Sequence, residues 1–159
     1  MSSYSIQNYI NDIRSVVKEE IEETKIIDRI KPLSKKIATN KTWVKQEYFD
    51  VDKEQGFGLH LLHEEKDHSL AVFAIAWAPG KGLAPHNHKT WAVVSGIQGQ
   101  EHETNYKRID DGSKEGYADL VKTHEETLYP GDASCCLPED IHSVWNNGQE
   151  IALSIHTYG

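Results

Sequence analysis

Three histidines are spaced in the chain as metal ligands often are. His86 and His88 are separated by one residue, and His142 follows in a later segment. On a β-strand, residues i and i+2 point to the same face, so both imidazoles of such a pair can project together. Taken alone, a His-x-His pair can bind a metal or lie on a solvent-exposed surface. The residues around the pair are needed to decide between a metal site and an exposed surface.

The last segment of the chain carries a second set of polar side chains. Ser154, His156 and Tyr158 occupy every second position, with Leu153, Ile155 and Thr157 between them. On a strand the three polar groups therefore share one face. That face either meets solvent or contributes hydroxyl and imidazole groups to a site.

The residues around the three histidines resemble the two motifs of the cupin superfamily, one with a His-x-His pair and one with a single histidine. The spacing residues are Gly80, Gly99, Gly131 and Asn146. The resemblance covers about residues 57–158 and implies an all-β fold, the double-stranded β-helix or cupin jelly-roll barrel. Two positions depart from the pattern. The acidic ligand would fall at Ala92 or Val93, and the second motif has Pro138 displaced and Glu139 in place of glycine.

A ligand set without a carboxylate has chemical consequences. Three neutral imidazoles leave the full double-positive charge on the metal and leave coordination positions open for thiolates, carboxylates and dioxygen. Open sites of this kind suit non-haem iron(II), whereas three histidines also suit catalytic zinc. We expect one iron(II) per chain on His86, His88 and His142, and zinc, nickel or manganese as substitutes that the same donors would accept.

The order Ser-x-His-x-Tyr in a three-histidine cupin resembles the thiol dioxygenases, the cysteine and 3-mercaptopropionate dioxygenase family. Three further stretches support the resemblance: 77–80 (Trp-Ala-Pro-Gly), 85–88 (Pro-His-Asn-His) and 154–159. It implies that Ser154 orients His156, which orients Tyr158 near the metal. It also implies an iron(II)-dependent enzyme that oxidises a small thiol carboxylate, 3-mercaptopropionate or cysteine, to its sulfinate with O2.

Two further residues are candidates for substrate binding. The position that holds an anchoring arginine or glutamine in characterised thiol dioxygenases falls at His60. An imidazole can donate one hydrogen bond to a carboxylate but lacks the bidentate guanidinium fork, so we expect 3-mercaptopropionate to be favoured over cysteine. Trp91 follows the histidine pair closely, and either lines the cavity or packs in the core.

Two other functions fit the same residues. The first is another metal-dependent cupin enzyme, a lyase or a carbon-directed dioxygenase, with Tyr158 as base. The second is a metal-bearing cupin module that binds ligands without turnover, because a fold does not fix a function. An oriented tyrosine favours an enzyme over a binding module.

Composition limits the partners of the chain. Its 159 residues are 38% hydrophobic and 26% charged, and the formal net charge of −8 disfavours nucleic acids and anionic membranes. No stretch approaches the ~20 apolar residues of a membrane span. The only cysteines, Cys135 and Cys136, are adjacent, which excludes a disulfide framework and indicates a reducing cytoplasm. We expect a monomer or a homodimer.

The chain divides into a helical segment, 1–42, and a barrel segment, 43–159, within one compact domain. Ile6, Tyr9, Ile10, Ile13 and Val17 recur at helical spacing and predict an amphipathic helix. Its N-cap is predicted at Ser3 or Ser5. A shorter helix is expected around 26–30, and Pro32 is expected to interrupt it.

From residue 43 onward, turn signals separate short stretches rich in Val, Ile, Trp, Tyr and Thr. They predict strands at 57–63, 69–78, 90–97, 99–109, 118–123, 126–129, 133–137, 141–146 and 149–158. Many short strands at this spacing are typical of an antiparallel barrel or sandwich.

Overall fold

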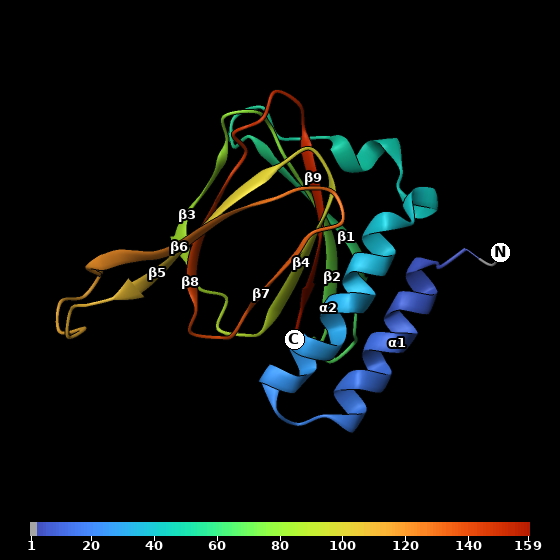
Figure 1. Cartoon of the computed structure of the whole chain (residues 1–159), viewed down its shortest axis with the longest axis horizontal. Helices are drawn as coiled ribbons and strands as arrows, with labels where there is room; N and C mark the ends of the chain where they lie inside the picture. The colour runs from blue at the N-terminus through green and yellow to red at the C-terminus, as the bar shows by residue number, and fades with distance from the viewer. Residues whose placement is uncertain (1–2) are drawn as a thin grey trace.

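Two facing antiparallel sheets form the body of the protein. The computed structural model describes residues 3–159 (Figure 1). The larger sheet has the strand order β1-β2-β9-β4-β7 and the smaller one the order β3-β8-β5-β6. The strands are β1 Phe57–Glu64, β2 Ala71–Trp77, β3 Gly82–His86, β4 Ala92–Gln98, β5 Glu101–Arg108, β6 Leu120–Leu128, β7 Ala133–Cys136, β8 Ile141–Trp145 and β9 Ala152–Tyr158. The predicted all-β double-stranded β-helix with N-terminal helices outside is confirmed.

The first helix, α1, runs from Ile6 to Glu19. The Ser5 hydroxyl accepts a hydrogen bond from the Asn8 backbone N–H, and the Asn8 side chain accepts one from the Ser5 N–H. This capping box identifies Ser5, and not Ser3, as the N-cap. The prediction that Val17 lies on the apolar face is wrong. Val16, three residues after Ile13, continues the buried face, and Val17 is 38% exposed.

The second helix, α2, runs from Glu23 to Thr39 and continues through Pro32. The prediction that Pro32 interrupts it is therefore wrong. A proline within a helix costs about 3 kcal/mol because it lacks an N–H and crowds the preceding turn. Pro32 lies on the exposed face, where water can satisfy the freed carbonyl. The buried face runs on to Ile37 and Ala38, and their burial offsets the local cost.

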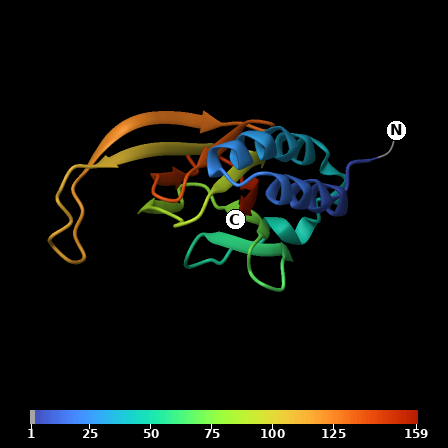
Figure 2. The same cartoon turned by 90° about the horizontal axis from the view of Figure 1, so that it is seen from below.

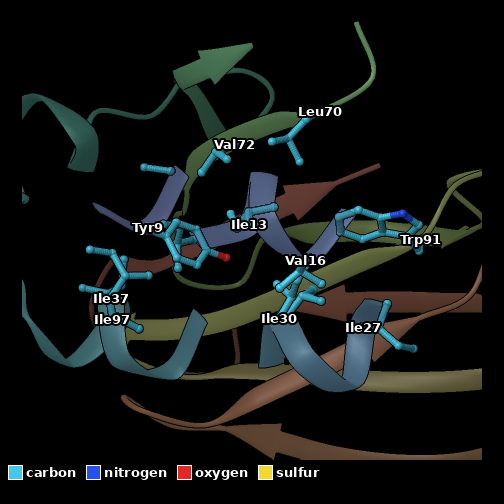
Figure 3. Close-up of a cluster of buried hydrophobic side chains, with 14 of the residues drawn as sticks. Tyr9, Ile13, Val16, Ile27, Ile30, Ile37, Leu70, Val72, Trp91 and Ile97 are labelled. Atoms are coloured by element: carbon cyan, nitrogen blue, oxygen red, sulfur yellow. The ribbon is translucent and has the colours of Figure 1, made fainter. Parts of the chain in front are cut away.

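The helices cover the outer face of the larger sheet (Figures 1 and 2). The α2 helix packs on β4 and β7, and α1 packs on α2. Figure 3 shows the apolar side chains of both helices meeting those of the sheet. Two buried hydrogen bonds link the layers, Tyr9 Oη to Thr157 Oγ1 at 2.6 Å and Ser34 Oγ to Ser95 Oγ at 2.7 Å. Within residues 3–159, neither helix combines the length and apolar composition of a membrane span.

Two strands differ from the prediction. β6 is one continuous strand where two were expected at 118–123 and 126–129. It is an edge strand with most side chains exposed to solvent. The polar residues in its middle therefore stay in water and do not interrupt the strand. β3 was missed because Gly82 and Pro85 weaken a strand pattern. It lies at the opposite edge of the smaller sheet, where the N–H that Pro85 lacks is dispensable.

The space between the sheets contains a buried carboxyl group. Glu101 on β5 is 3% exposed, and its Oε1 has no hydrogen-bond partner among the described residues. Burial raises the pKa of this carboxyl from 4.5 to about 7; the nearby Ser154 hydroxyl opposes the shift and the charge of Glu103 adds to it. The folded protein therefore binds a proton at Glu101 that the unfolded chain releases at lower pH.

This raised pKa makes stability depend on pH. The contribution of protonated Glu101 is complete below pH 4.5 and is lost as the pH rises through 7. Between pH 4.5 and 8, the free energy of unfolding of Glu101→Gln should increase relative to wild type by about 3 kcal/mol, measured by urea denaturation. Glu115→Gln, which changes an exposed carboxyl, is the control. Parallel pH curves for wild type and Glu101→Gln would contradict this assignment.

Candidate metal centre

The structure brings the three predicted ligand histidines together. His86 ends β3 and lies opposite His142 of β8 in the strand register. One ring nitrogen from each of His86, His88 and His142 lies within 4.8 Å of the others. The Nε2 atoms of His86 and His88 are 3.2 Å apart. Two nitrogens bound to one metal at about 2.1 Å lie roughly 3.0–3.4 Å apart for angles between octahedral and tetrahedral, so the spacing fits a shared ion.

His88 does not lie on the strand as expected. β3 ends at His86, and the chain then turns, with Lys89 at a φ of 54° and its N–H bonded to the Pro138 carbonyl. The turn, and not the strand alternation, brings the imidazole of His88 back toward that of His86.

Burial keeps two of the three histidines, His86 and His88, neutral. It lowers the pKa of His88 to about 4, with smaller contributions from the neighbouring His142 and His86, and it also lowers the pKa of His86. Neutral imidazoles have a lone pair to offer a metal without first losing a proton. Nε2 of His142 is buried and has no hydrogen-bond partner within residues 3–159, which is the environment expected of an unfilled ligand atom.

The opposite nitrogens of two ligands are held by acceptors. Nδ1 of His86 lies 2.8 Å from the Ala84 carbonyl oxygen, and Nδ1 of His142 lies 3.4 Å from Glu103 Oε1. Such contacts fix the tautomer and leave Nε2 available to a metal ion. Cys136 Sγ is 3.7 Å from the same Nδ1 of His142, and burial raises the pKa of its thiol, so it stays protonated.

Glu103 is a further functional residue that the sequence motifs do not indicate. This carboxylate is 2% exposed and accepts a hydrogen bond from Ser134 Oγ at 2.8 Å. Burial would raise its pKa, but the contacts with His142 and Ser134 outweigh burial, and the net pKa is lowered. Glu103 lies two residues after Glu101 in a stretch predicted to be a strand, so both side chains share one face. This alternation is the sequence feature that could have indicated a buried carboxylate.

Ser154, His156 and Tyr158 form a hydrogen-bonded series on β9. Ser154 Oγ is 2.8 Å from His156 Nε2, and His156 Nδ1 is 3.0 Å from Tyr158 Oη. Burial lowers the pKa of His156 to about 3, helped by the neighbouring ligand histidines. Burial also raises the pKa of Tyr158, so the phenol stays protonated. The rings of Tyr158 and His88 have centroids 5.2 Å apart, which places the phenol beside the metal centre.

A cavity of about 240 Å³ opens beside the three histidines. Its lining residues are Phe57, Leu59, Ile75, Trp77, Leu83, His86, His88, His142, Val144, His156 and Tyr158. Its volume equals that of roughly eight water molecules at ~30 Å³ each, which suits a small substrate. A larger hollow of about 830 Å³ near Gln100 and Tyr129 contains none of these histidines.

The structure places His60, predicted to contact substrate, away from the cavity lining. Its Nε2 lies 3.0 Å from the backbone oxygen of Asp50, and its ring packs near Tyr48, 5.8 Å between centroids. Side chains alternate along β1, and Leu59 takes the cavity-facing place one residue earlier. Gly58 allows this arrangement, because a Cβ there would lie 1.9 Å from the Asp50 oxygen.

Trp91 packs in the core, the second of the two alternatives. It is 6% exposed and belongs to the apolar cluster between the helices and the larger sheet (Figure 3). It precedes β4 and is not part of the cavity lining.

Comparisons with known proteins bear on the fold. No protein-family model matches the chain. The cupin domain of Schizosaccharomyces pombe Cnp3 is similar with a TM-score of 0.55 at 12% identity, over 74% of this chain and 68% of that one. KdgF from Halomonas sp. gives 0.52 at 16% identity, over 72% and 89%.

An oxalate oxidase in complex with the substrate analogue glycolate gives a TM-score of 0.53 at 14% identity, over 72% of this chain and 58% of the enzyme. The chain thus spans just over half the length of that oxidase. At these identities the similarity concerns the fold. The protein has the cupin fold, a jelly-roll barrel with its candidate metal centre between the two sheets.

Proposed function

We propose that the protein is an iron(II)-dependent thiol dioxygenase. The observation that carries the proposal is the series Ser154, His156 and Tyr158, which ends beside a cluster of three histidines in one cavity. A protonated phenol held by a neutral imidazole is a fixed hydrogen-bond donor next to a metal.

The donor set suits a thiol substrate. Three neutral imidazoles do not offset the charge of a divalent ion, so an anionic thiolate is attracted to it. When bound, iron(II) would allow O2 to add both oxygen atoms to the sulfur. The overall change is RSH + O2 → RSO2H: sulfur loses four electrons, O2 gains them, and no external reductant is needed.

The residues of the chain orient the reactants and exclude water. Tyr158 donates a hydrogen bond into the cavity, and His156 holds the phenol through Nδ1. Ser154 fixes the imidazole through Nε2. The apolar walls of the cavity keep water from the reacting sulfur.

A small thiol carboxylate is the substrate that the family resemblance implies. 3-Mercaptopropionate can chelate a metal through sulfur and carboxylate, and cysteine through sulfur and amine. Because His60 points away from the cavity, neither carboxylate gains a contact from it. A lyase that uses Tyr158 as base is less favoured, since burial raises the pKa of the phenol and holds its proton.

Loss of one ligand should abolish metal retention. Wild-type protein reconstituted anaerobically should keep one iron(II) per chain after desalting, and His88→Ala should keep none, measured by plasma mass spectrometry. His68→Ala, a change at an exposed turn histidine, should retain the metal. Stoichiometric iron in His88→Ala would assign the ion to other ligands.

Loss of the phenol hydroxyl should slow turnover. Tyr158→Phe should lower kcat by roughly 10²–10³-fold, the usual effect of removing one oriented donor. Oxygen uptake and sulfinate formation with a panel of thiols measure the effect, and Tyr117→Phe at an exposed tyrosine is the control. Uptake without sulfinate, or full activity of Tyr158→Phe, would contradict the proposed reaction.

A further inference from the structure

The cavity beside the three histidines has a mainly apolar lining. Its polar lining residues are the three histidines, His156 and Tyr158. The rest of the lining consists of Phe57, Leu59, Ile75, Trp77, Leu83 and Val144. None of the lining residues that the structure describes is a lysine, arginine, aspartate or glutamate.

The entrance to the cavity is apolar as well. Leu59 is 58% exposed and Leu83 is 39% exposed, and both belong to the lining. Large exposed apolar side chains around a concave site are typical of a surface that binds an apolar ligand. His60 of β1 could have served as a donor at this entrance, but its side chain lies on the opposite side of the strand.

An ionised group on the substrate would have favourable partners only at the histidine end of the cavity, in the metal and the Tyr158 hydroxyl. A carboxylate that reaches neither would lie against apolar side chains without a hydrogen-bonding or charged partner, which is strongly unfavourable. An alkyl or aryl group in the same place would be buried favourably. The cavity therefore discriminates against charge on the part of the substrate beyond the sulfur.

One donor on the wall has no partner. Trp77 is 4% exposed, and no described residue accepts a hydrogen bond from its buried Nε1. Because this nitrogen is buried, a ligand in the cavity does not reach it, and Trp77 lines the cavity with the carbon atoms of its ring.

We propose that the cavity takes thiols whose remaining part is uncharged and largely apolar. This inference rests on the proposed thiol dioxygenase function, and it replaces a thiol carboxylate with a neutral thiol as the preferred substrate class.

Matched thiols test the preference. Oxygen uptake by the iron(II)-loaded protein is measured with 6-mercaptohexanoate, its methyl ester and hexane-1-thiol, because the longer chain keeps the carboxylate from chelating the metal together with the sulfur. We expect kcat/KM for the ester to exceed that for the acid by at least about tenfold, the effect of one unpaired buried group. Hexane-1-thiol should be turned over at least as well as the ester, because its chain is apolar throughout. A preference for the acid would overturn the inference and leave the dioxygenase proposal intact.

A binding measurement separates the two proposals. Anaerobic calorimetry with the iron(II)-loaded protein gives affinities for the acid and the ester whether or not turnover occurs. Tighter binding of the ester without sulfinate formation from any thiol would overturn the proposed reaction and support the apolar cavity. Tighter binding of the acid would overturn the apolar cavity.

A charge introduced at the entrance should reverse the preference. Leu59→Arg places a guanidinium at a lining position and should shift the acid-to-ester ratio of kcat/KM toward the acid by about tenfold or more. Leu61→Arg is the matched control, because Leu61 is a similarly exposed leucine of β1, at 53%, outside the lining. An unchanged ratio in Leu59→Arg, or equal shifts in both variants, would count against selection by this wall.

Discussion

The two faces of β9 connect the hydrophobic core to the site. β9 is the central strand of the larger sheet, paired with β2 on one side and β4 on the other. Its outer face packs under the helices, where Thr157 bonds to Tyr9. Its inner face carries the series from Ser154 to Tyr158. A shift of one residue in the register of β9 would exchange these faces, so the burial of the outer face fixes the orientation of the inner one.

Removal from water sets the charge of several groups in the barrel interior. It keeps the imidazoles of His88 and His156 neutral and the phenol of Tyr158 protonated. The two buried acids of β5 show that hydrogen-bonding and charged partners can keep a buried carboxyl ionised. Glu103 has partners in His142 and Ser134 and stays ionised, whereas Glu101 has an unpaired oxygen and holds its proton to higher pH.

The cavity separates two kinds of recognition. A divalent ion held by the three histidines would supply a concentrated positive charge at one end, and the wall around Leu59 and Trp77 supplies apolar surface at the other. With the proposed function, a thiolate would bind at the metal and the apolar wall would exclude charge elsewhere. The neutral Ser-His-Tyr series borders the same cavity through His156 and Tyr158 and adds no net charge to it.

The sequence by itself determined the barrel, the N-terminal helices, the three grouped histidines and the Ser-His-Tyr series, because local periodicity and motif spacing encode them. Tertiary structure decided the rest. The packing of α2 carried the helix through Pro32, and the edge position of β3 accommodated Pro85. Which side of β1 faces the cavity depended on long-range strand pairing, so His60 turned outward and Leu59 inward. Glu103 gained its role only when folding brought β5 beside β8, since no local pattern records a contact between distant strands.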